Sequence, residues 1–131
     1  MAFSVGIDLG TTNTVVSTAR RGISSNIEVT TEAIDQIVNE EWGDIESSTL
    51  LPSVLYVNNG LHNVGLMARD MKGQSSNRVI FSSKYYMGEN DYKWEIDDKE
   101  YSPEIVASYF LSAVRKHLLQ KYRDEESIDS A

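Results

Sequence analysis

Residues 5–16 read VGIDLGTTNTVV, and this stretch combines residue types that can bind phosphate. An apolar run leads into Asp8, turns at a glycine and becomes apolar again. The backbone N–H groups of such a turn face one concavity, which suits an anion such as phosphate. The threonine hydroxyls add donors, while glycine can take positive φ and lets a ligand approach the backbone. The residues of the turn are Gly10, Thr11, Thr12 and Asn13.

The carboxylate of Asp8 adds a condition to this site. A carboxylate repels bare phosphate, so we expect a cation between the two, and Mg²⁺, which keeps most of its waters, is the natural one. Neither G-x-x-x-x-G-K nor G-x-G-x-x-G occurs in the chain, and the residues after the turn favour a strand. The residues alone leave two interpretations open, a hairpin-type phosphate loop and an ordinary tight turn.

Composition limits the class of protein. The 131 residues suit one domain or a piece of a larger one, with 40% hydrophobic and 24% charged residues. The net charge of −8 argues against a nucleic-acid-binding surface. No apolar run approaches the ~18 residues of a membrane span, and the start does not resemble a signal peptide. The absence of cysteine excludes disulfides and thiolate metal sites, and it agrees with a cytoplasmic protein.

The elements that would position the turn are short strands. Val5–Ile7 and Asn13–Ala19 are expected to form a hairpin, and Ile27–Thr30 is expected to add a third strand. Apolar residues of the next segment have helical spacing, but a polar run with Gly43 interrupts them. We therefore expect residues 31–48 to be mostly loop.

The second half of the chain has clearer signals. Pro52–Val57 is expected to be a strand with proline at its start, where a missing donor does least harm. Asn58-Asn59-Gly60 predicts a hairpin turn, and Leu61–Val64 should return as the next strand. Gly65–Met71 is expected to form a short helix. Trp42 and Trp94 are interpreted as packing groups.

A long helix is expected near the end of the chain. Ser102 is a good N-cap, Pro103 suits the first helical position, and Glu104 favours the positive end of the helix dipole. No buried element is expected after Tyr122. An apolar stripe, interpreted as core packing, comprises Ile105, Tyr109, Phe110, Ala113, Val114 and Leu118.

Gly6–Thr14 resembles the first phosphate motif of the actin-like ATPase superfamily. The resemblance is closest to the seventy-kilodalton heat-shock chaperones of the DnaK type. Leu51–Tyr56 resembles the family's Thr-Pro-Ser strand, with leucine in place of the usual threonine. Val64–Ala68 resembles its Val-Gly-x-x-Ala helix start, and Asn77–Gly88 resembles the segment that carries its catalytic lysine.

The resemblance covers nearly the whole chain. The helix from Tyr101 to Tyr122 is similar to the one that leads from the family's peripheral subdomain back to the core. Residues 31–50 depart from the family and look like an insertion.

This resemblance implies roles for individual residues. Asp8 would hold Mg²⁺ through water, and Lys84 would be the catalytic residue that reaches the terminal phosphate. Tyr85 stands where the family usually has arginine, which puts in doubt any ion pair made by that arginine. The contacts to the phosphates of ATP or ADP would be Gly10, Thr11, Thr12 and Asn13.

The fold class implied is α/β, with a partial ribonuclease-H-like (actin-like ATPase) fold of mixed sheet hairpins and a long C-terminal helix. Residues 1–31 would form the first core hairpin, residues 50–101 the peripheral subdomain, and residues 102–122 the helix that returns to the core. The chain would be the amino-terminal fragment of a nucleotide-binding domain. Its parent protein would bind unfolded peptides and co-chaperones.

Several parts of the family's site have no counterpart in this sequence, among them the second phosphate loop and the adenosine pocket. We therefore expect the chain alone to bind nucleotide weakly and not to hydrolyse ATP. Core strands near Val5, Val15 and Ile27 would have open edges, so self-association is expected. One alternative is a fragment of an actin-like filament protein or a sugar kinase, against which the Lys84 segment argues. Another is a non-catalytic protein-interaction module.

Overall fold

The computed structural model describes residues 3–22, 26–39, 41–89, 91–122 and 128–130. The helices are α1 (Leu66–Met71) and α2 (Pro103–Lys121), with 3₁₀ turns η1 (Ser76–Arg78) and η2 (Ser83–Tyr86). The strands are β1 (Phe3–Leu9), β2 (Asn13–Arg21), β3 (Ile27–Thr31), β4 (Ile34–Asn39), β5 (Asp44–Ser48), β6 (Leu51–Pro52), β7 (Val54–Asn58), β8 (Leu61–Val64), β9 (Val79–Phe81), β10 (Trp94–Ile96), β11 (Lys99–Tyr101) and β12 (Ile128–Ser130).

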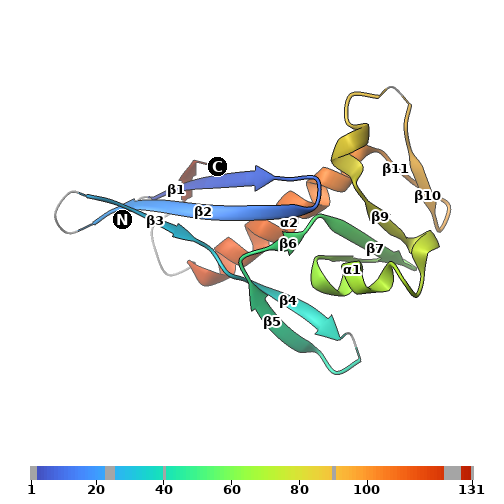
Figure 1. Ribbon diagram of the computed structural model, residues 1–131, viewed down its shortest axis with the longest axis horizontal. Helices are drawn as coiled ribbons and strands as arrows, with labels where there is room; N and C mark the ends of the chain where they lie inside the picture. Colours follow the sequence, from blue (N-terminus) through green and yellow to red (C-terminus); the bar gives the residue numbers. More distant parts are fainter. Residues whose placement is uncertain (1–2, 23–25, 40, 90, 123–127, 131) are drawn as a thin grey trace.

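The largest sheet is built on the amino-terminal hairpin. Its order is β12-β1-β2-β3, with β6 pairing to β2 beyond the end of β3. The β1–β2 and β2–β3 pairs are antiparallel, as expected from the sequence. In Figure 1 this sheet lies across α2, and its hairpin turn points toward β7 and β9. The sheet thus holds the Gly10 turn at one end.

No buried element was expected after Tyr122, but a short strand, β12, follows α2 and joins the first sheet. Strand β12 pairs in parallel with β1, with Phe3 opposite Ile128 and Ser4 opposite Ser130. The segment Ile128–Ser130 is short and polar, so its own residues do not predict a strand. Its strand conformation depends on the pairing with β1. The strand that contains Val15, β2, has neighbouring strands on both sides and is therefore not the open edge that was expected. Of the edges expected to be open, those of β3 and of β1 beyond Ser4 have no neighbouring strand among the described residues, and self-association through them stays a prediction.

A second sheet, β8-β7-β9, follows the first. The expected hairpin turn is confirmed: Asn58 pairs with Leu61, and Asn59 and Gly60 both have positive φ, at 47° and 87°. This is the backbone of a tight two-residue hairpin loop, which asparagine and glycine tolerate. Strand β7 is buried on both faces because α1 covers one side and α2 covers the other. The expected short helix is confirmed as α1.

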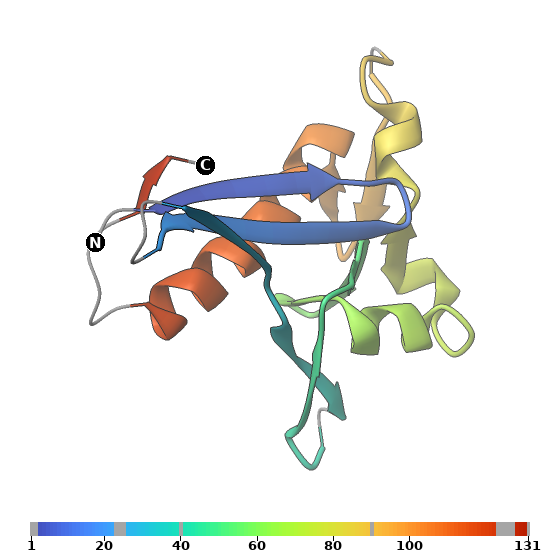
Figure 2. The same ribbon diagram turned by 60° about the vertical axis from the view of Figure 1, so that its left-hand side comes forward.

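Helix α2 joins the two sheets. Its C-terminal half packs Val114 and Leu118 against β1 and β2, while its N-terminal half packs Val106 and Phe110 against β7 and β9. Figure 2 shows the helix crossing behind the strands of the first sheet. One helix therefore fixes the position of the Gly10 turn relative to the second sheet.

The N-terminus of α2 is as predicted, but its buried residues differ from the predicted stripe: Val106 and Ala107 are buried, Tyr109 and Ala113 are only half-buried, and Ile105 is exposed. The Ser102 hydroxyl accepts a hydrogen bond from the N–H of Ile105 at 3.2 Å, and proline occupies the first turn. Ile105 itself is 45% exposed, so its expected place in the core was wrong. Val106 is buried instead, because it lies four residues before Phe110 on the same face.

The expectation of a loop over residues 31–48 was also wrong. Strands β4 and β5 form an antiparallel hairpin with an irregularity between Ile37 and Asn39. The apolar residues of β4 have spacings that suit either a helix or a strand, so periodicity alone could not decide. Figures 1 and 2 both show the hairpin extending away from the rest of the molecule. Trp42 in its turn is 73% exposed and is not a packing group.

Trp94, by contrast, packs as expected. Its ring lies edge-on to Tyr86 and Tyr92, with centroids 5.7 and 4.9 Å away.

Arg78 binds both carboxylate oxygens of Asp97 at 2.9 and 2.8 Å. The Arg78 hydrogen bond, together with one from a backbone N–H, lowers the pKa of the Asp97 carboxyl. The tip of the β10–β11 hairpin is thereby tied to the second sheet.

The molecule is a mixed α/β structure with several antiparallel strand pairs and one long helix near the end of the chain, which confirms the coarse fold class. None of the described helices has the length and apolar character that crossing a membrane requires.

Candidate functional site

The turn between β1 and β2 is a tight loop closed by its own backbone. The Gly10 N–H donates to the carbonyl oxygens of Asp8 and Asn13, at 3.1 and 3.0 Å. A Cβ on Gly10 would lie 2.4 Å from the Asn13 carbonyl oxygen, so only glycine fits. Gly10 is not among the glycines with positive φ, and close approach of backbone is therefore the reason for it. The N–H groups of Thr11 and Thr12 donate no hydrogen bond to other described residues, which leaves them available to a ligand.

Ser53 fixes this loop from the segment that follows β6. Its hydroxyl donates to the Gly10 carbonyl at 2.9 Å, and its N–H donates to the Thr12 carbonyl at 2.9 Å. The Thr14 hydroxyl lies 2.9 Å from the Ser53 hydroxyl. Because the single hydroxyl proton of Ser53 goes to Gly10, Thr14 must be the donor in that pair. Both hydroxyls are buried, so the loop is held in place before any ligand arrives.

A cavity of about 130 Å³ lies beside the loop. Its lining combines residues of the loop with two basic residues, one in α1 and one just after it. Arg69 and Lys72 are three residues apart, which places them on one face of the helical turn. The residues that line the cavity are Thr11, Thr12, Pro52, Ser53, Val54, Arg69, Lys72, Phe81 and Ser82.

Two further features distinguish the lining of the cavity: a cation–π contact of Lys72 and the backbone conformation of Ser82. The Lys72 ammonium lies 4.0 Å from the centroid of the Phe81 ring, a cation–π contact that holds the side chain near the cavity. Ser82 has φ 55°, a left-handed conformation that is uncommon for a residue other than glycine. Such backbone strain is often found at functional sites. Ser82 directly precedes η2, which carries Lys84.

The structure brings some of the predicted site residues together and leaves others apart. Thr11 and Thr12 line the cavity, and Gly10 closes the turn behind them. Asn13 begins β2, where it pairs with Pro52 of β6. The remaining two residues, Asp8 on β1 and Lys84 on η2, are exposed and do not line the cavity.

Sequence reasoning missed five polar, basic or aromatic contributors to the cavity. Ser53 was part of a recognised segment, but its bonds to Gly10 and Thr14 span 43 and 39 residues, which no local pattern reveals. The basic pair at the end of a short helix resembles ordinary surface residues. The contributors are Ser53, Arg69, Lys72, Phe81 and Ser82.

The carboxylate of Asp8 fits a hydrated Mg²⁺ better than a metal held by a protein cage. The described residues contain no group of three or more His, Cys, Asp or Glu side chains that could hold a metal ion. Mg²⁺ at a phosphate site is usually bound by one or two carboxylates, phosphate oxygens and waters. A single exposed carboxylate near a phosphate loop satisfies that requirement.

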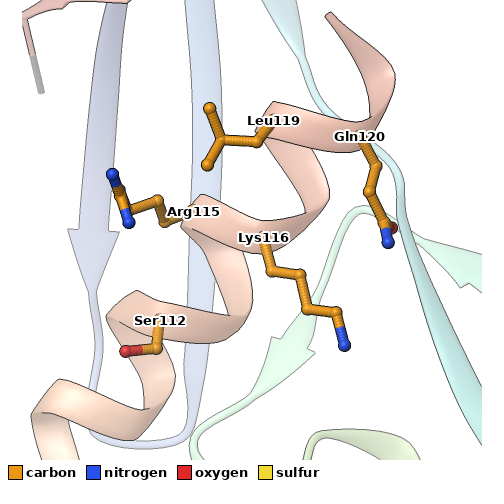
Figure 3. A pocket seen from close by; sticks show the side chains of 5 residues that line it. All are labelled: Ser112, Arg115, Lys116, Leu119 and Gln120. Carbon is orange, nitrogen blue, oxygen red and sulfur yellow. The ribbon is translucent and has the colours of Figure 1, made fainter. Parts of the chain in front are cut away.

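A larger hollow of about 360 Å³ lies on the outer side of α2. Figure 3 shows that its side chains all come from one helix and spread apart from one another. It has no converging backbone donors, since interior N–H groups of a helix are bonded within it. The hollow is lined by Ser112, Arg115, Lys116, Leu119 and Gln120. The cavity beside Gly10 is therefore the better candidate for binding an anion.

Comparison with known proteins agrees with the resemblance at the Gly10 turn. A family model described as Hsp70 protein matches residues 4–126. The chaperone protein DnaK of Thermosipho melanesiensis is 36% identical over 115 residues, which cover 87% of this chain and 17% of the relative. The DnaK of Thermotoga neapolitana matches with the same identity and coverage. The DnaK of Thermotoga maritima is 35% identical over 114 residues, which cover 86% of this chain. The chain spans 17% of the length of these curated relatives, and it belongs to the Hsp70 family.

Proposed function

We propose that this chain is the amino-terminal, ATP-binding part of a DnaK-type molecular chaperone. It supplies the first phosphate loop and the catalytic lysine of a site that binds ATP or ADP with Mg²⁺. The parent protein binds unfolded peptides and co-chaperones in the cytoplasm and acts in the stress response. The observation that supports this most is the Ser53-fixed turn, where Thr11 and Thr12 line a cavity with two basic residues and their N–H groups make no hydrogen bond to other described residues.

Each residue has a role that suits phosphoryl transfer, which depends on positioning and charge stabilisation more than on covalent chemistry. Thr11 and Thr12 donate to phosphate oxygens, and Asp8 holds Mg²⁺ through water. Lys84 reaches the terminal phosphate, and in the described part of the chain its ammonium makes no ion pair that would compete. The basic side chains of the cavity, Arg69 and Lys72, add positive potential.

The sheet order supports a partial ribonuclease-H-like fold. Strand β12, which follows α2, lies parallel to β1 at the edge of the first sheet, so the sheet combines antiparallel and parallel pairs. The second phosphate loop and the adenosine pocket of the family would come from the other lobe of the domain. We therefore expect the chain alone to bind nucleotide with a dissociation constant on the order of a millimolar and not to hydrolyse it.

Removing the two cations of the cavity tests this function. We expect the Arg69→Gln/Lys72→Gln double variant to bind inorganic tripolyphosphate about tenfold more weakly than the wild type, because two positive charges next to the phosphate are lost. NMR titration of amide shifts measures affinities in this range. The Lys99→Gln variant is the control, since Lys99 is exposed on β11 and lies outside the cavity.

Two outcomes would contradict the proposal. One is an unchanged affinity of the double variant, and the other is an equal loss of affinity in Lys99→Gln. A non-catalytic interaction module would show neither tripolyphosphate binding in the wild type nor any response to these substitutions.

A further inference from the structure

The β4–β5 hairpin contributes no residue to the cavity beside Gly10. We propose that the free edge of β5 binds an extended segment of a protein partner, in which basic and apolar residues alternate. The partner segment adds as a third strand to the hairpin. This inference does not depend on the nucleotide site.

The root of the hairpin is fixed to the body of the molecule. The buried Gln36 side chain accepts a hydrogen bond from the Leu66 N–H at 3.0 Å and donates one to the Leu50 carbonyl at 3.1 Å. Glycine suits position 65 because its φ of 113° is rarely adopted by L side chains, and a Cβ there would also lie 2.3 Å from the Gln36 side-chain oxygen. The hairpin is thus held at its base against the start of α1.

Beyond this base, strand β5 is open. It pairs with β4 only, and no other strand of the described residues lies along its outer edge. All of its residues except Ser48 are exposed. An isolated two-stranded hairpin is marginally stable in water, and an open edge with regular alternation can accept another strand.

The two faces of the hairpin differ in chemistry. Ile37 lies opposite Ile45 on one face, and they are 44% and 65% exposed. The carboxylates of Asp44 and Glu46 alternate with Ile45 along β5 and so lie on the other face. The exposed indole of Trp42 stands in the turn between the strands.

Charge identifies the partner. Residues 33–50 contain five acidic residues and no lysine or arginine. A strand that places lysine or arginine beside Asp44 and Glu46, and an apolar side chain beside Ile45, matches both faces of β5. A second copy of this chain would place carboxylates against carboxylates, which disfavours self-pairing at this edge. Anionic nucleic acid and anionic membrane surfaces are disfavoured for the same reason.

The test uses the full 131-residue chain with Trp94 replaced by phenylalanine, so that Trp42 is the only tryptophan. The probe is a short synthetic peptide that alternates lysine with valine or isoleucine, and its counterpart carries glutamate in place of lysine. We expect the lysine peptide to shift Trp42 emission to shorter wavelength in a saturable way, less so at high salt. The glutamate peptide should bind at least about tenfold more weakly.

Substitutions in the hairpin locate the binding edge. We expect Asp44→Asn/Glu46→Gln and, separately, Ile45→Ser to weaken binding of the lysine peptide about tenfold each. The matched charge control is Glu95→Gln/Glu100→Gln on the β10–β11 hairpin, and the matched apolar control is Leu61→Ser on β8, 62% exposed. Both controls should bind like the parent protein.

Hydrogen exchange provides a second measurement that does not depend on Trp42. Binding of the lysine peptide should slow exchange of β5 amides and leave β10 and β11 unchanged. The proposal is overturned if the lysine peptide causes no shift in Trp42 emission, or if the glutamate peptide binds equally well. It is also overturned if the chain self-associates in a manner that Ile45→Ser abolishes, since the occupant would then be a second copy.

Discussion

Replacing Glu32 with alanine is expected to lower the free energy of unfolding by about 2–3 kcal/mol. The Glu32 carboxylate is fully buried between β3 and β4, and it accepts hydrogen bonds from Thr18, Lys121 and Tyr122. The Lys121 ammonium lies 2.7 Å from it and is 43% exposed, so that cation can turn to solvent when its partner is lost. The buried hydroxyl of Thr18 cannot reach solvent in this way, and the loss of its acceptor accounts for much of the expected change.

Glu32 matters because it joins the first sheet to the C-terminal end of α2. Denaturant unfolding at neutral pH measures the change, and Glu32→Gln, which keeps the volume and one acceptor, should cost only about 1 kcal/mol. The control is Glu95→Ala, an exposed glutamate on β10. If Glu32→Ala unfolds at the same denaturant concentration as Glu95→Ala, the proposed anchor of α2 is wrong.

The same carboxylate predicts a pH dependence. Burial alone would raise the pKa of Glu32, but the hydrogen bonds from Lys121 and Tyr122 and the charge of Lys121 outweigh it and lower the pKa below its ordinary value of 4.5. Folding therefore favours the charged form. Its contribution to stability is present above that ordinary value and is lost as the pH falls through the lower pKa of the folded protein. The difference in stability between the wild type and Glu32→Gln should shrink over that acidic range.

Replacing Gly10 with alanine is expected to weaken the binding of Mg²⁺–ATP at least about tenfold. The new methyl group would lie 2.4 Å from the Asn13 carbonyl oxygen, which is backbone and cannot turn away. The turn must open, and this displaces the Thr11 and Thr12 N–H groups from the cavity. The strain should also lower the free energy of unfolding by about 1–3 kcal/mol.

Strand β1, which leads into this turn, offers a matched control. A Cβ on Gly6 would meet its nearest neighbour, the Ser17 carbonyl oxygen, at 4.0 Å, so Gly6→Ala introduces no clash. NMR titration with Mg²⁺–ATP measures affinity, and thermal unfolding measures stability. An affinity of Gly10→Ala equal to that of Gly6→Ala would mean that the shape of this turn has no part in nucleotide binding.

Local chemistry made several elements predictable from the sequence. Asn59-Gly60 tolerates the positive φ of a tight hairpin, and Ser102-Pro103 combines a side-chain cap with a fixed φ. The turn at Gly10 was recognisable because Gly10 and the two threonines are adjacent in the chain. In each case the residues that determine the structure are neighbours in sequence.

Features set by distant contacts could not be predicted. Ser53, 43 residues further along the chain, holds the Gly10 turn, and the two basic residues of the cavity come from α1 and its C-cap. Strand β4 was missed because its apolar spacing also fits a helix, and only the pairing of Ile37 with Ile45 decides between the two. Strand β12 depends wholly on its pairing with β1.

The most direct test of the phosphate site is the map of amide shifts in the isotope-labelled chain during titration with Mg²⁺–ATP. The largest shifts are expected at Thr11 and Thr12, with smaller ones at Ser53 and Ser82, and inorganic tripolyphosphate should reproduce the pattern. Shifts centred on the outer side of α2 near Lys116, with both threonine amides unchanged, would contradict the account.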